Sequence, residues 1–489
     1  MKNYIIYSLL IFVSIGFTAC ETDFLDKNPK DKLSSTEFWK SKSDLDMALT
    51  AVYASAQGGG GIVSYGMPNL DVLTDNAYGQ HNYWSSQTFV QGNISPSTEG
   101  YITDLYNTCY QGITRVNIFL DKLKSYQGTD VDSNEKLLYE AEARFFRGYY
   151  YYLLYFGYGA VPVITEPLTL ENQDQPKATA QQVLDQSLSD IDFAIANLST
   201  ALYPDAAGHA VKTSAQALKL RVLMYAAYDP SGGVNTEVLT QARDVALDLM
   251  SSGYSLDPNY EDVFRDGTQE SSPEIMFSIK FLAPDNATPM DQWYGDWLVV
   301  SPLENLVNAY EVGDLRLEKS IFEDVVEING DTHSPSNDDP TGFGLKKFLS
   351  PGLMPYGYST QSQQDWVMLR YAEVLLSYAE AQNELVGPDQ SVVDAMDAIR
   401  NRAGLSNLPT GLTKDDMREL IRHERRIELA FEGIRYYDLK RWRIAEDVLN
   451  NVTDGILSYF FEERFYLWPL PQTEIDKSQG VLEQNPDYL

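Results

Sequence analysis

Residues 137–159, LLYEAEARFFRGYYYYLLYFGYG, decide the fold that we expect for this chain. Their apolar and small side chains recur at steps of three and four residues, so they share one face of a helix. These side chains are Leu138, Ala141, Phe145, Gly148, Tyr152 and Tyr155. A second face carries Glu140 four residues before Arg144, the spacing of a favourable ion pair. The pattern predicts a buried helix of an all-α domain, with Ala141 and Gly148 as places where a neighbouring helix comes close.

The same helix and three further segments carry motifs that can be compared with known families. Residues 142–163 read EARFFRGYYYYLLYFGYGAVPV, and residues 423–442 read HERRIELAFEGIRYYDLKRW. The chain opens, after a first apolar segment, with ETDFLDKNPKDKLSSTEFWKS at residues 21–41, and it ends with FYLWPLPQTEIDKSQGVLEQNPDYL at residues 465–489. Together these segments resemble the SusD/RagB family, the surface glycan-binding lipoproteins of Bacteroidetes. Asp487 stands where glycine is usual in the terminal motif.

The resemblance covers nearly the whole chain and therefore implies a fold as well as a function. It implies a mostly α, SusD-like fold built on tetratricopeptide-like helix pairs, with long irregular loops and a few short strands. Hydrophobic periodicity predicts helices in nine places. They are residues 44–57 after an N-cap at Ser43, 102–126, 133–157, 180–198, 213–228, a helix opening at an N-cap at Thr236, 365–386, 391–403, and 414–449 with a break at Gly433. Residues 58–99 lack helical periodicity and predict a long functional loop.

The N-terminus has the pattern of an exported lipoprotein. Lys2 precedes a largely apolar run that ends in Thr18-Ala19-Cys20, so residues 1–19 are predicted to be a signal peptide. A cysteine directly at the cut resembles a bacterial lipobox, although Phe17 replaces the usual leucine. We therefore expect lipidation of Cys20, a tether over residues 20–36 and one glycan-binding domain over residues 37–489. An ordinary cleaved secretory peptide is the alternative.

The net charge and the cysteine content limit how this protein can attach to a membrane and which ligands it can bind. Loss of residues 1–19 removes one basic and no acidic residue, leaving 36 basic against 70 acidic residues, a formal charge of −34. Such a chain is repelled by nucleic acid and by anionic lipid, so attachment is expected through the N-terminal lipid alone. The charge also favours neutral glycans over uronic-acid polymers. The sequence has only two cysteines, Cys20 and Cys109, so lipidation of the first leaves no intramolecular disulfide to form.

No catalytic or cofactor motif is found in the sequence, and we expect neither an enzyme nor a cofactor. The four histidines are dispersed at His81, His209, His333 and His423. Asp71 and Asp75, in NLDVLTDN, are the one tempting carboxylate pair for a glycosidase. A structural calcium ion at Asn337, Asp338 and Asp339 remains an alternative, but EF-hand spacing is absent and a solvated loop is favoured.

Two irregular stretches combine flat aromatic faces with polar groups, the residue types that bind sugar rings and their hydroxyls. The first lies between Tyr78 and Trp84, and the second between Asp291 and Trp297. The other four tryptophans, Trp39, Trp366, Trp442 and Trp468, lie in or beside family motifs and are expected to be buried. Each loop tryptophan taken alone fits a packing role equally well.

The resemblance to SusD-like proteins implies that this chain has a shallow site, formed by the loop after the first helix and a mid-chain loop. It makes Trp84 and Trp293 the candidate stacking platforms, with Asp71 and Asn82 as polar partners. The remaining candidates are Tyr83, Tyr294, Trp297 and Arg370. For Arg370 a structural salt bridge with Glu373 or another acid is an equal alternative.

The resulting hypothesis is an outer-membrane, surface-exposed lipoprotein that captures oligo- or polysaccharide. It would pass the glycan to a SusC-like TonB-dependent transporter, on which its large helical face docks. Two rivals come from other classes of protein. One is a surface glycoside hydrolase using Asp71 or Asp75, and the other is a helical scaffold that binds only proteins.

Overall fold

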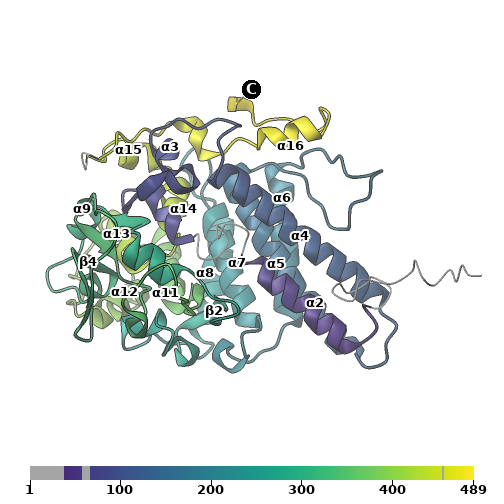
Figure 1. Ribbon diagram of the computed structural model, residues 1–489. Helices are drawn as coiled ribbons and strands as arrows, with labels where there is room; N and C mark the ends of the chain where they lie inside the picture. The colour runs from purple at the N-terminus through teal and green to yellow at the C-terminus, as the bar shows by residue number, and fades with distance from the viewer. Residues whose placement is uncertain (1–37, 58–66, 454–455, 489) are drawn as a thin grey trace, which may run out of the picture.

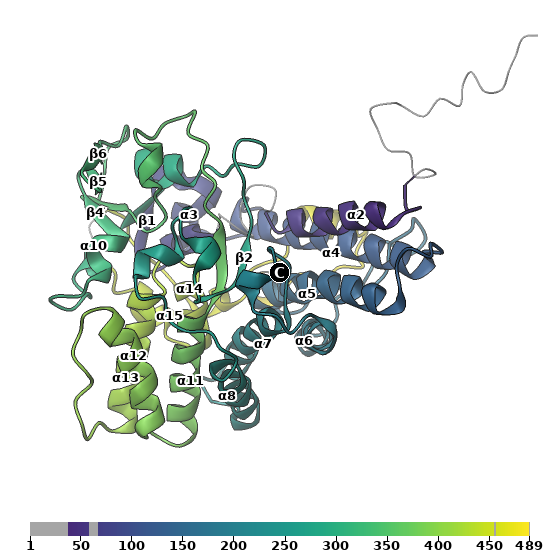
Figure 2. The same ribbon diagram turned by 90° about the horizontal axis from the view of Figure 1, so that it is seen from below.

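The computed structural model describes residues 38–57, 67–453 and 456–488, and all structural statements below concern these residues. Helices dominate, and the few strands are short. The predicted signal peptide, Cys20 and the tether lie outside the described residues. Figures 1 and 2 show a layer of long helices on one side of the molecule, and on the other side a second group of helices with the short strands beside it. The mostly α fold expected from the sequence is confirmed.

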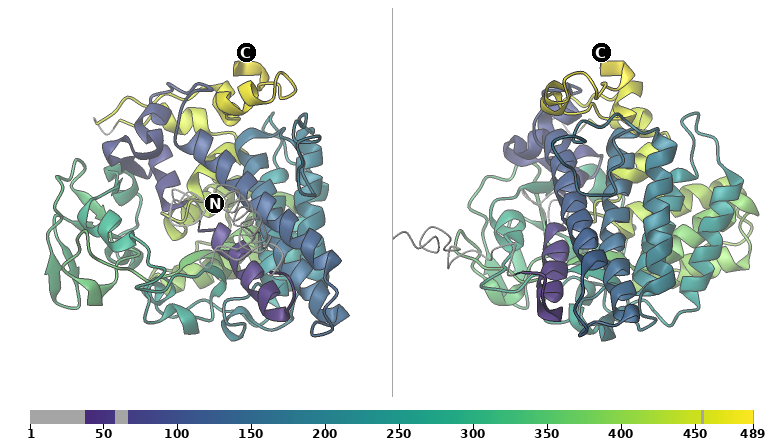
Figure 3. Two further views of the ribbon diagram at one scale, coloured as in Figure 1. Left: turned by 45° about the vertical axis from the view of Figure 1, so that its right-hand side comes forward. Right: turned by 90° about the vertical axis from the view of Figure 1, so that its right-hand side faces the viewer.

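The first half of the chain forms an array of packed helices. They are α2 (Lys42–Ser55), α4 (Tyr101–Ser125), α5 (Ser133–Tyr158), α6 (Ala180–Asn197), α7 (Lys212–Ala226) and α8 (Thr236–Met250). From α4 to α8 each helix packs on the next in chain order, and α2 lies against α4. This array forms one face of the molecule in the right-hand view of Figure 3.

Helix α5 is buried on nearly every side and organises this array. A Cβ atom added to Gly148 would lie 2.7 Å from Cγ1 of Ile191 on α6, which confirms the expected close approach. The hydroxyl of Ser187 donates to the Gly148 carbonyl at 2.7 Å. Arg147 is also buried and donates two hydrogen bonds of 2.7 Å to Asp190. The helix therefore holds α6 through both a steric fit and a buried, bidentate ion pair.

The second half combines helices with paired strands. Its helices are α9 (Glu304–Val307), α10 (Arg316–Ser320), α11 (Tyr371–Leu385), α12 (Gln390–Arg402), α13 (Lys414–Glu428), α14 (Arg435–Arg441), α15 (Ala445–Leu449) and α16 (Gln472–Lys477). The strands described form antiparallel pairs: β1 (Ala77–Gly79) with β3 (Val300–Pro302), β2 (Ile275–Ile279) with β8 (Trp366–Arg370), β4 (Ile321–Glu323) with β7 (Phe343–Leu345), and β5 (Val326–Ile328) with β6 (Asp331–His333).

Several predicted boundaries were wrong, for local physical reasons. Residues 366–370 form a strand and not the start of a helix, because this fully buried segment pairs with β2. The helix expected over residues 414–449 is divided into α13, α14 and α15. Helix α2 begins earlier than predicted, since the Ser41 hydroxyl, and not Ser43, accepts from the Asp44 amide. Asn235 caps α8 in place of Thr236.

The two halves share one core, which the C-terminal motif closes. The rings of Phe156 on α5 and Tyr437 on α14 stack with their centroids 3.7 Å apart. Trp468 is fully buried, and its amide donates to the Gly157 carbonyl at 2.7 Å. Trp366 and Trp442 are also buried, as predicted, whereas Trp39 is half-buried. Among the helices of the described residues, none has the length and apolar character needed to cross a bilayer.

A buried carboxylate at the crossing of α11, α13 and α14 gives the stability a predictable pH dependence. Burial opposes ionisation of Glu380, but Arg441 and Arg425 outweigh it and lower the pKa of Glu380 to about 2. Because this pKa lies below the value of 4.5 for an unperturbed glutamate, the stabilisation is present above that value and is lost as the pH falls toward 2. Between pH 7 and pH 3 the wild type is expected to lose about 2 kcal/mol more than Glu380→Gln. Urea unfolding at both pH values measures this difference, and equal losses in the two proteins would refute the assignment.

Candidate functional site

The structure brings Trp84 and Trp293 together although they lie far apart in the sequence. The pairing of β1 with β3 is the cause, because residues 80–85 follow β1 directly and residues 291–299 lead into β3. In an antiparallel pair the end of one strand meets the start of the other. The two indole rings lie edge to face, with centroids 5.5 Å apart, and both are half-buried. The two predicted platforms are thus parts of one aromatic surface.

The loop that carries Trp84 has an unusual backbone. His81, Asn82, Trp84 and Ser85 all adopt left-handed conformations, with φ values of 60°, 54°, 51° and 61°. Such values are uncommon outside glycine, and they cluster at ligand-binding sites where the surroundings hold the chain in place. Gly100 provides part of that support, because a Cβ atom there would lie 2.1 Å from the Trp84 carbonyl oxygen. Only glycine allows the start of α4 to approach this turn so closely.

The loop that carries Trp293 has a second irregularity. Residues 291–296 form a π-helical turn, a rare element that is frequently found at functional sites. Trp297 follows this turn and is half-buried, and its ring lies 5.8 Å from that of Tyr358 between centroids. Tyr358 is 87% exposed. This tyrosine was not predicted from the sequence, where its only signal is its position in the polar segment 357–362, GYSTQS.

Polar and aromatic groups surround this surface. Tyr83 is 37% exposed, and its ring lies 5.8 Å from those of both His81 and Trp84. The Asn82 side chain accepts from the Gln87 amide at 2.9 Å, so it caps the short helix α3 (Ser86–Val90) as well as lying at the surface. Of the predicted residues in the two neighbouring loops, five therefore reach this surface. They are Asn82, Tyr83, Trp84, Trp293 and Trp297.

Residues 334–339 pack against both loops. The Asn337 side-chain amide contacts His81 Nε2 at 3.0 Å and donates to the Trp297 carbonyl at 3.0 Å. Asp339 Oδ1 accepts from the amides of Thr341 and Gly342 and so forms a turn. No group of three or more His, Cys, Asp or Glu side chains in the described part of the chain is arranged to hold a metal ion. The Asn337 side chain thus connects the two loops.

Asp71 and Tyr294 do not reach this surface. Asp71 is fully buried and accepts hydrogen bonds from the Asn76 side chain and from the amides of Phe431 and Gly433. Burial raises the pKa of Asp71 to about 6. Tyr294 is also fully buried. Both were predicted as glycan contacts, and we correct that interpretation: Asp71 positions the segment before β1, and Tyr294 is part of the core.

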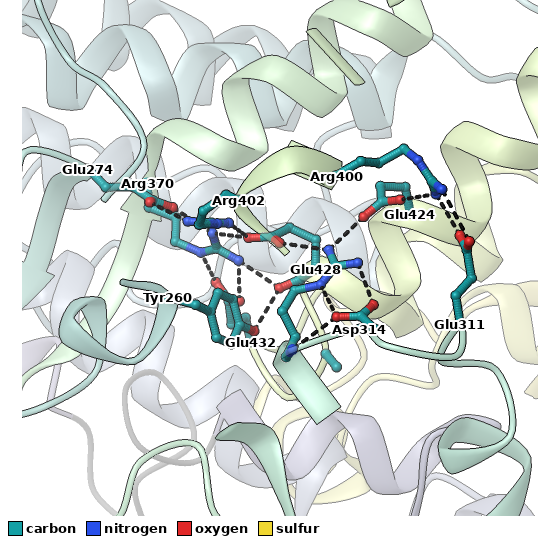
Figure 4. Close-up of polar contacts among 12 residues, drawn as sticks. Tyr260, Glu274, Glu311, Asp314, Arg370, Arg400, Arg402, Glu424, Glu428 and Glu432 are labelled. Atoms are coloured by element: carbon teal, nitrogen blue, oxygen red, sulfur yellow. Dashed lines mark hydrogen bonds and ion pairs between the residues drawn. The ribbon is translucent and has the colours of Figure 1, made fainter. Parts of the chain in front are cut away.

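Arg370 is the third correction, because it lies at the end of β8 inside a buried ion-pair network (Figure 4). Its guanidinium donates to Glu274 at 2.7 Å, to Glu428 at 2.6 Å, and to both carboxylate oxygens of Glu432. The side chain is only 1% exposed. Glu373 pairs with Arg221 instead. The structural alternative, an ion pair with another acid, is therefore confirmed, and Arg370 cannot contact a ligand at the aromatic surface.

The network continues through several elements of the second half. Glu428 also contacts Arg316 at 2.9 Å and Arg402, and Arg316 in turn contacts Asp314 and Glu424. Figure 4 shows Arg402 from α12, Glu424 and Glu428 from α13, and Asp314 from the loop before α10 converging. Arg316 is the first residue of α10. The network fixes the end of α13 and the turn after it. Since that turn supplies the two amides that hold Asp71, the network supports the segment that leads to β1 and Trp84.

The carboxylate pair considered for hydrolysis is not accessible. Asp75 is 4% exposed and accepts two hydrogen bonds of 2.9 Å from Arg435. Arg426 lies 3.1 Å away. Burial alone would raise the pKa of Asp75, but the two arginines outweigh it and lower it. Asp71 and Asp75 are thus both engaged in the interior, and neither is placed to meet a glycosidic bond.

Comparison with known proteins gives family matches at both ends of the chain. The family model described as "SusD family" matches residues 318–488. The model described as "Starch-binding associating with outer membrane" matches residues 23–224. A relative from Formosa agariphila, SusD-like protein P2, is 23% identical over the full length of both chains.

Solved structures share the fold. A SusD-like carbohydrate-binding protein from Bacteroides fragilis is 25% identical, with a TM-score of 0.77, and the match covers 91% of this chain and 99% of that one. A laminarin-binding SusD-like protein is 24% identical, with a TM-score of 0.75, over 92% of this chain and 100% of that one. The SusD-like fold expected from the sequence is confirmed.

Proposed function

The chain belongs to the SusD/RagB family, and from this membership we propose that it is a surface glycan-binding lipoprotein. It captures an oligo- or polysaccharide and delivers it to a SusC-like TonB-dependent transporter in the outer membrane. Binding and release suffice for this role, and no covalent chemistry is required of the protein.

The observation that carries the proposal is the pairing of Trp84 with Trp293 on two irregular loops. The rings lie edge to face, are half-buried, and are held by a left-handed backbone on one side and a π-helical turn on the other. Indole faces bind the C–H faces of sugar rings, and Asn82, Tyr83 and Trp297 add amide, hydroxyl and aromatic groups nearby. A relative of the same fold is described as laminarin-binding, which supports a neutral glucan as one candidate ligand.

Lipid at Cys20 anchors the protein in this proposal, and the strong negative charge keeps the rest of the chain from binding anionic lipid directly. The large helical face, part of the array of the first half, docks on the transporter. The aromatic loops lie outside that helical array, so they remain available for a glycan while the partner is bound.

The two rival functions have less support. A hydrolase that uses Asp71 or Asp75 requires carboxylates that reach the substrate, whereas both are buried and hydrogen-bonded. A scaffold that binds only proteins does not account for the paired tryptophans on strained loops. Neither rival is supported by a specific feature of the described residues.

A binding screen tests the proposal directly. The soluble chain beginning at residue 21 is run in affinity electrophoresis through laminarin and through other neutral polysaccharides of plants, fungi and bacteria. Retardation by at least one of them, followed by calorimetry with its oligosaccharides and no release of reducing ends, is the expected result. Absence of retardation throughout the panel would mean that the lone protein does not capture neutral glycans, and release of reducing ends would support the hydrolase.

A further inference from the structure

A concave surface lies on the helical half, and neither Trp84 nor Trp293 lines it. It is a cleft of about 750 Å³ between one face of α4, the segment after α5 over residues 162–175, and α16 with the residues that follow it. These elements lie at the top and upper right of Figure 1. The volume falls within the range of roughly 300–1,000 Å³ that is typical of small-molecule pockets. The three walls come from distant parts of the sequence, so the cleft exists only in the folded chain.

The α4 wall presents two tyrosines that are fixed in orientation. Tyr106 and Tyr110 lie one helical turn apart, with ring centroids 4.7 Å from each other. The Tyr110 hydroxyl donates to the Pro162 carbonyl at 2.7 Å, which ties the ring to the opposite wall. Tyr106 is buried and Tyr110 half-buried, so the second ring offers part of its surface to the cleft. A rigid aromatic wall of this kind suits the apolar face of a sugar ring.

The polar side chains around these rings are not used by the fold. Asn107, Gln111 and Thr114 line the cleft from α4 and are exposed, and Gln173 lines it from the opposite wall. Within the described residues, these four side chains form no hydrogen bond to the protein. Each amide offers donors and an acceptor together, which matches adjacent hydroxyl groups of a sugar. The cleft therefore has unused hydrogen-bonding capacity beside an aromatic wall.

The charges that line the cleft balance, in a chain whose net charge is −33. Arg115 and Lys477 are matched by Asp174 and Glu474. Glu474 and Lys477 also pair with each other at 2.7 Å. A site without excess charge, rich in amides and hydroxyls, disfavours an ionic ligand and suits a neutral, hydroxyl-rich one.

We propose that the cleft between α4, residues 162–175 and α16 is a second binding site, separate from Trp84 and Trp293, for a neutral oligosaccharide. The choice of a carbohydrate rests on the proposed function of the chain, while the concavity, the aromatic wall and the charge balance do not depend on it. Tyr101, the first residue of α4, contacts the Trp84 ring with centroids 6.3 Å apart, so one helix carries parts of both sites. Two sites on one rigid body raise the apparent affinity for a polysaccharide that reaches both.

The test separates the two sites by substitution in the soluble chain. Asn107→Ala with Gln111→Ala removes exposed cleft groups without touching the core, and Asp121→Ala with Lys124→Ala is the control pair on the same helix outside the cleft. Trp84→Ala with Trp293→Ala removes the first site. Affinity electrophoresis is run in laminarin and in each panel polysaccharide that retards the wild type. Circular dichroism and thermal unfolding confirm that all variants are folded.

The cleft pair is expected to reduce the affinity at least about fivefold, from the loss of hydrogen bonds to the sugar, while the control pair leaves it unchanged. The tryptophan pair is expected to retain weak retardation, and adding the cleft pair to it is expected to abolish that retardation.

The proposal is overturned if the cleft pair binds like its control, or if the tryptophan pair alone removes all retardation. Neither result contradicts the proposed function. If no polysaccharide retards the wild type, the proposed function fails first and this inference with it. If the cleft pair abolishes binding that the tryptophan pair leaves intact, the cleft stands and the aromatic loops are not the site.

Discussion

Trp293→Ala is expected to weaken glycan binding by about 30-fold or more, the usual effect of removing a dominant aromatic contact worth about 2 kcal/mol. The substitution removes a stacking face and also the edge-to-face support of Trp84, whose ring centroid lies 5.5 Å away. Both losses act on the same surface. Calorimetry with the oligosaccharide of the polysaccharide found in the screen gives the affinity ratio.

Trp39→Ala is the matched control for this experiment. Trp39 is a half-buried tryptophan that precedes α2 and contacts Phe119 on α4, far from the aromatic loops in the chain. Its replacement removes as much aromatic surface and some stability but should leave glycan affinity within a factor of about two. If Trp293→Ala binds as tightly as the wild type while remaining folded, the two-tryptophan surface is not the binding site.

Glu428→Ala is expected to destabilise the protein by about 4 kcal/mol. Glu428 is fully buried and contacts Arg316, Arg370 and Arg402, so its removal leaves three buried guanidinium groups without a shared counter-charge. Burial opposes its ionisation, but the three arginines prevail and hold the pKa of Glu428 far below its usual range. Urea unfolding followed by intrinsic fluorescence measures the change in the free energy of unfolding.

Glu419→Ala, on the same helix α13, provides the comparison. Glu419 pairs with Arg422, but its side chain is 72% exposed, so a loss of no more than about 0.5 kcal/mol is expected. If Glu428→Ala does not accumulate as folded protein, Glu428→Gln, which keeps the shape and part of the hydrogen bonding, is expected to unfold at a lower urea concentration than the wild type. Equal midpoints for Glu428→Gln, Glu419→Ala and the wild type would show that the network does not stabilise the fold.

Helix α5 shows which features can be predicted from sequence. Its periodicity, the pairing of Glu140 with Arg144 at 2.5 Å, and the close approach at Gly148 all follow from residues a few positions apart, and the structure confirms each of them. The strand β8 shows the opposite case. Its first four residues are apolar and precede a true helix, and only the distant partner β2 makes them extended. Local patterns cannot report a partner far away in the chain.

In the candidate site too, local sequence predicts some features, whereas others depend on distant partners. Trp84 and Trp293 were found from residue type and loop composition, but their meeting depends on the pairing of β1 with β3. Asp71 was chosen as a polar partner at the site that the resemblance implies, and Arg370 because it could reach the same face; both are residue types that hydrogen-bond sugar hydroxyls. Arg370 is held by the carboxylates of Glu274, Glu428 and Glu432, and Asp71 by backbone amides of the turn after α13. All of these partners lie far from the two residues in the sequence. Charge alone does not distinguish a ligand contact from an interior ion pair.

The left-handed backbone from His81 to Ser85 has a consequence for how fast a ligand is captured. Each of these non-glycine conformations costs on the order of 1 kcal/mol, and the cost is met when the protein folds, with the close approach at Gly100 helping to hold the turn. A sugar that stacks on Trp84 therefore meets a loop that is already ordered and does not have to organise it during the encounter. Capture is then governed by diffusion and orientation, and differences in affinity among glycans are expected to appear in their residence times.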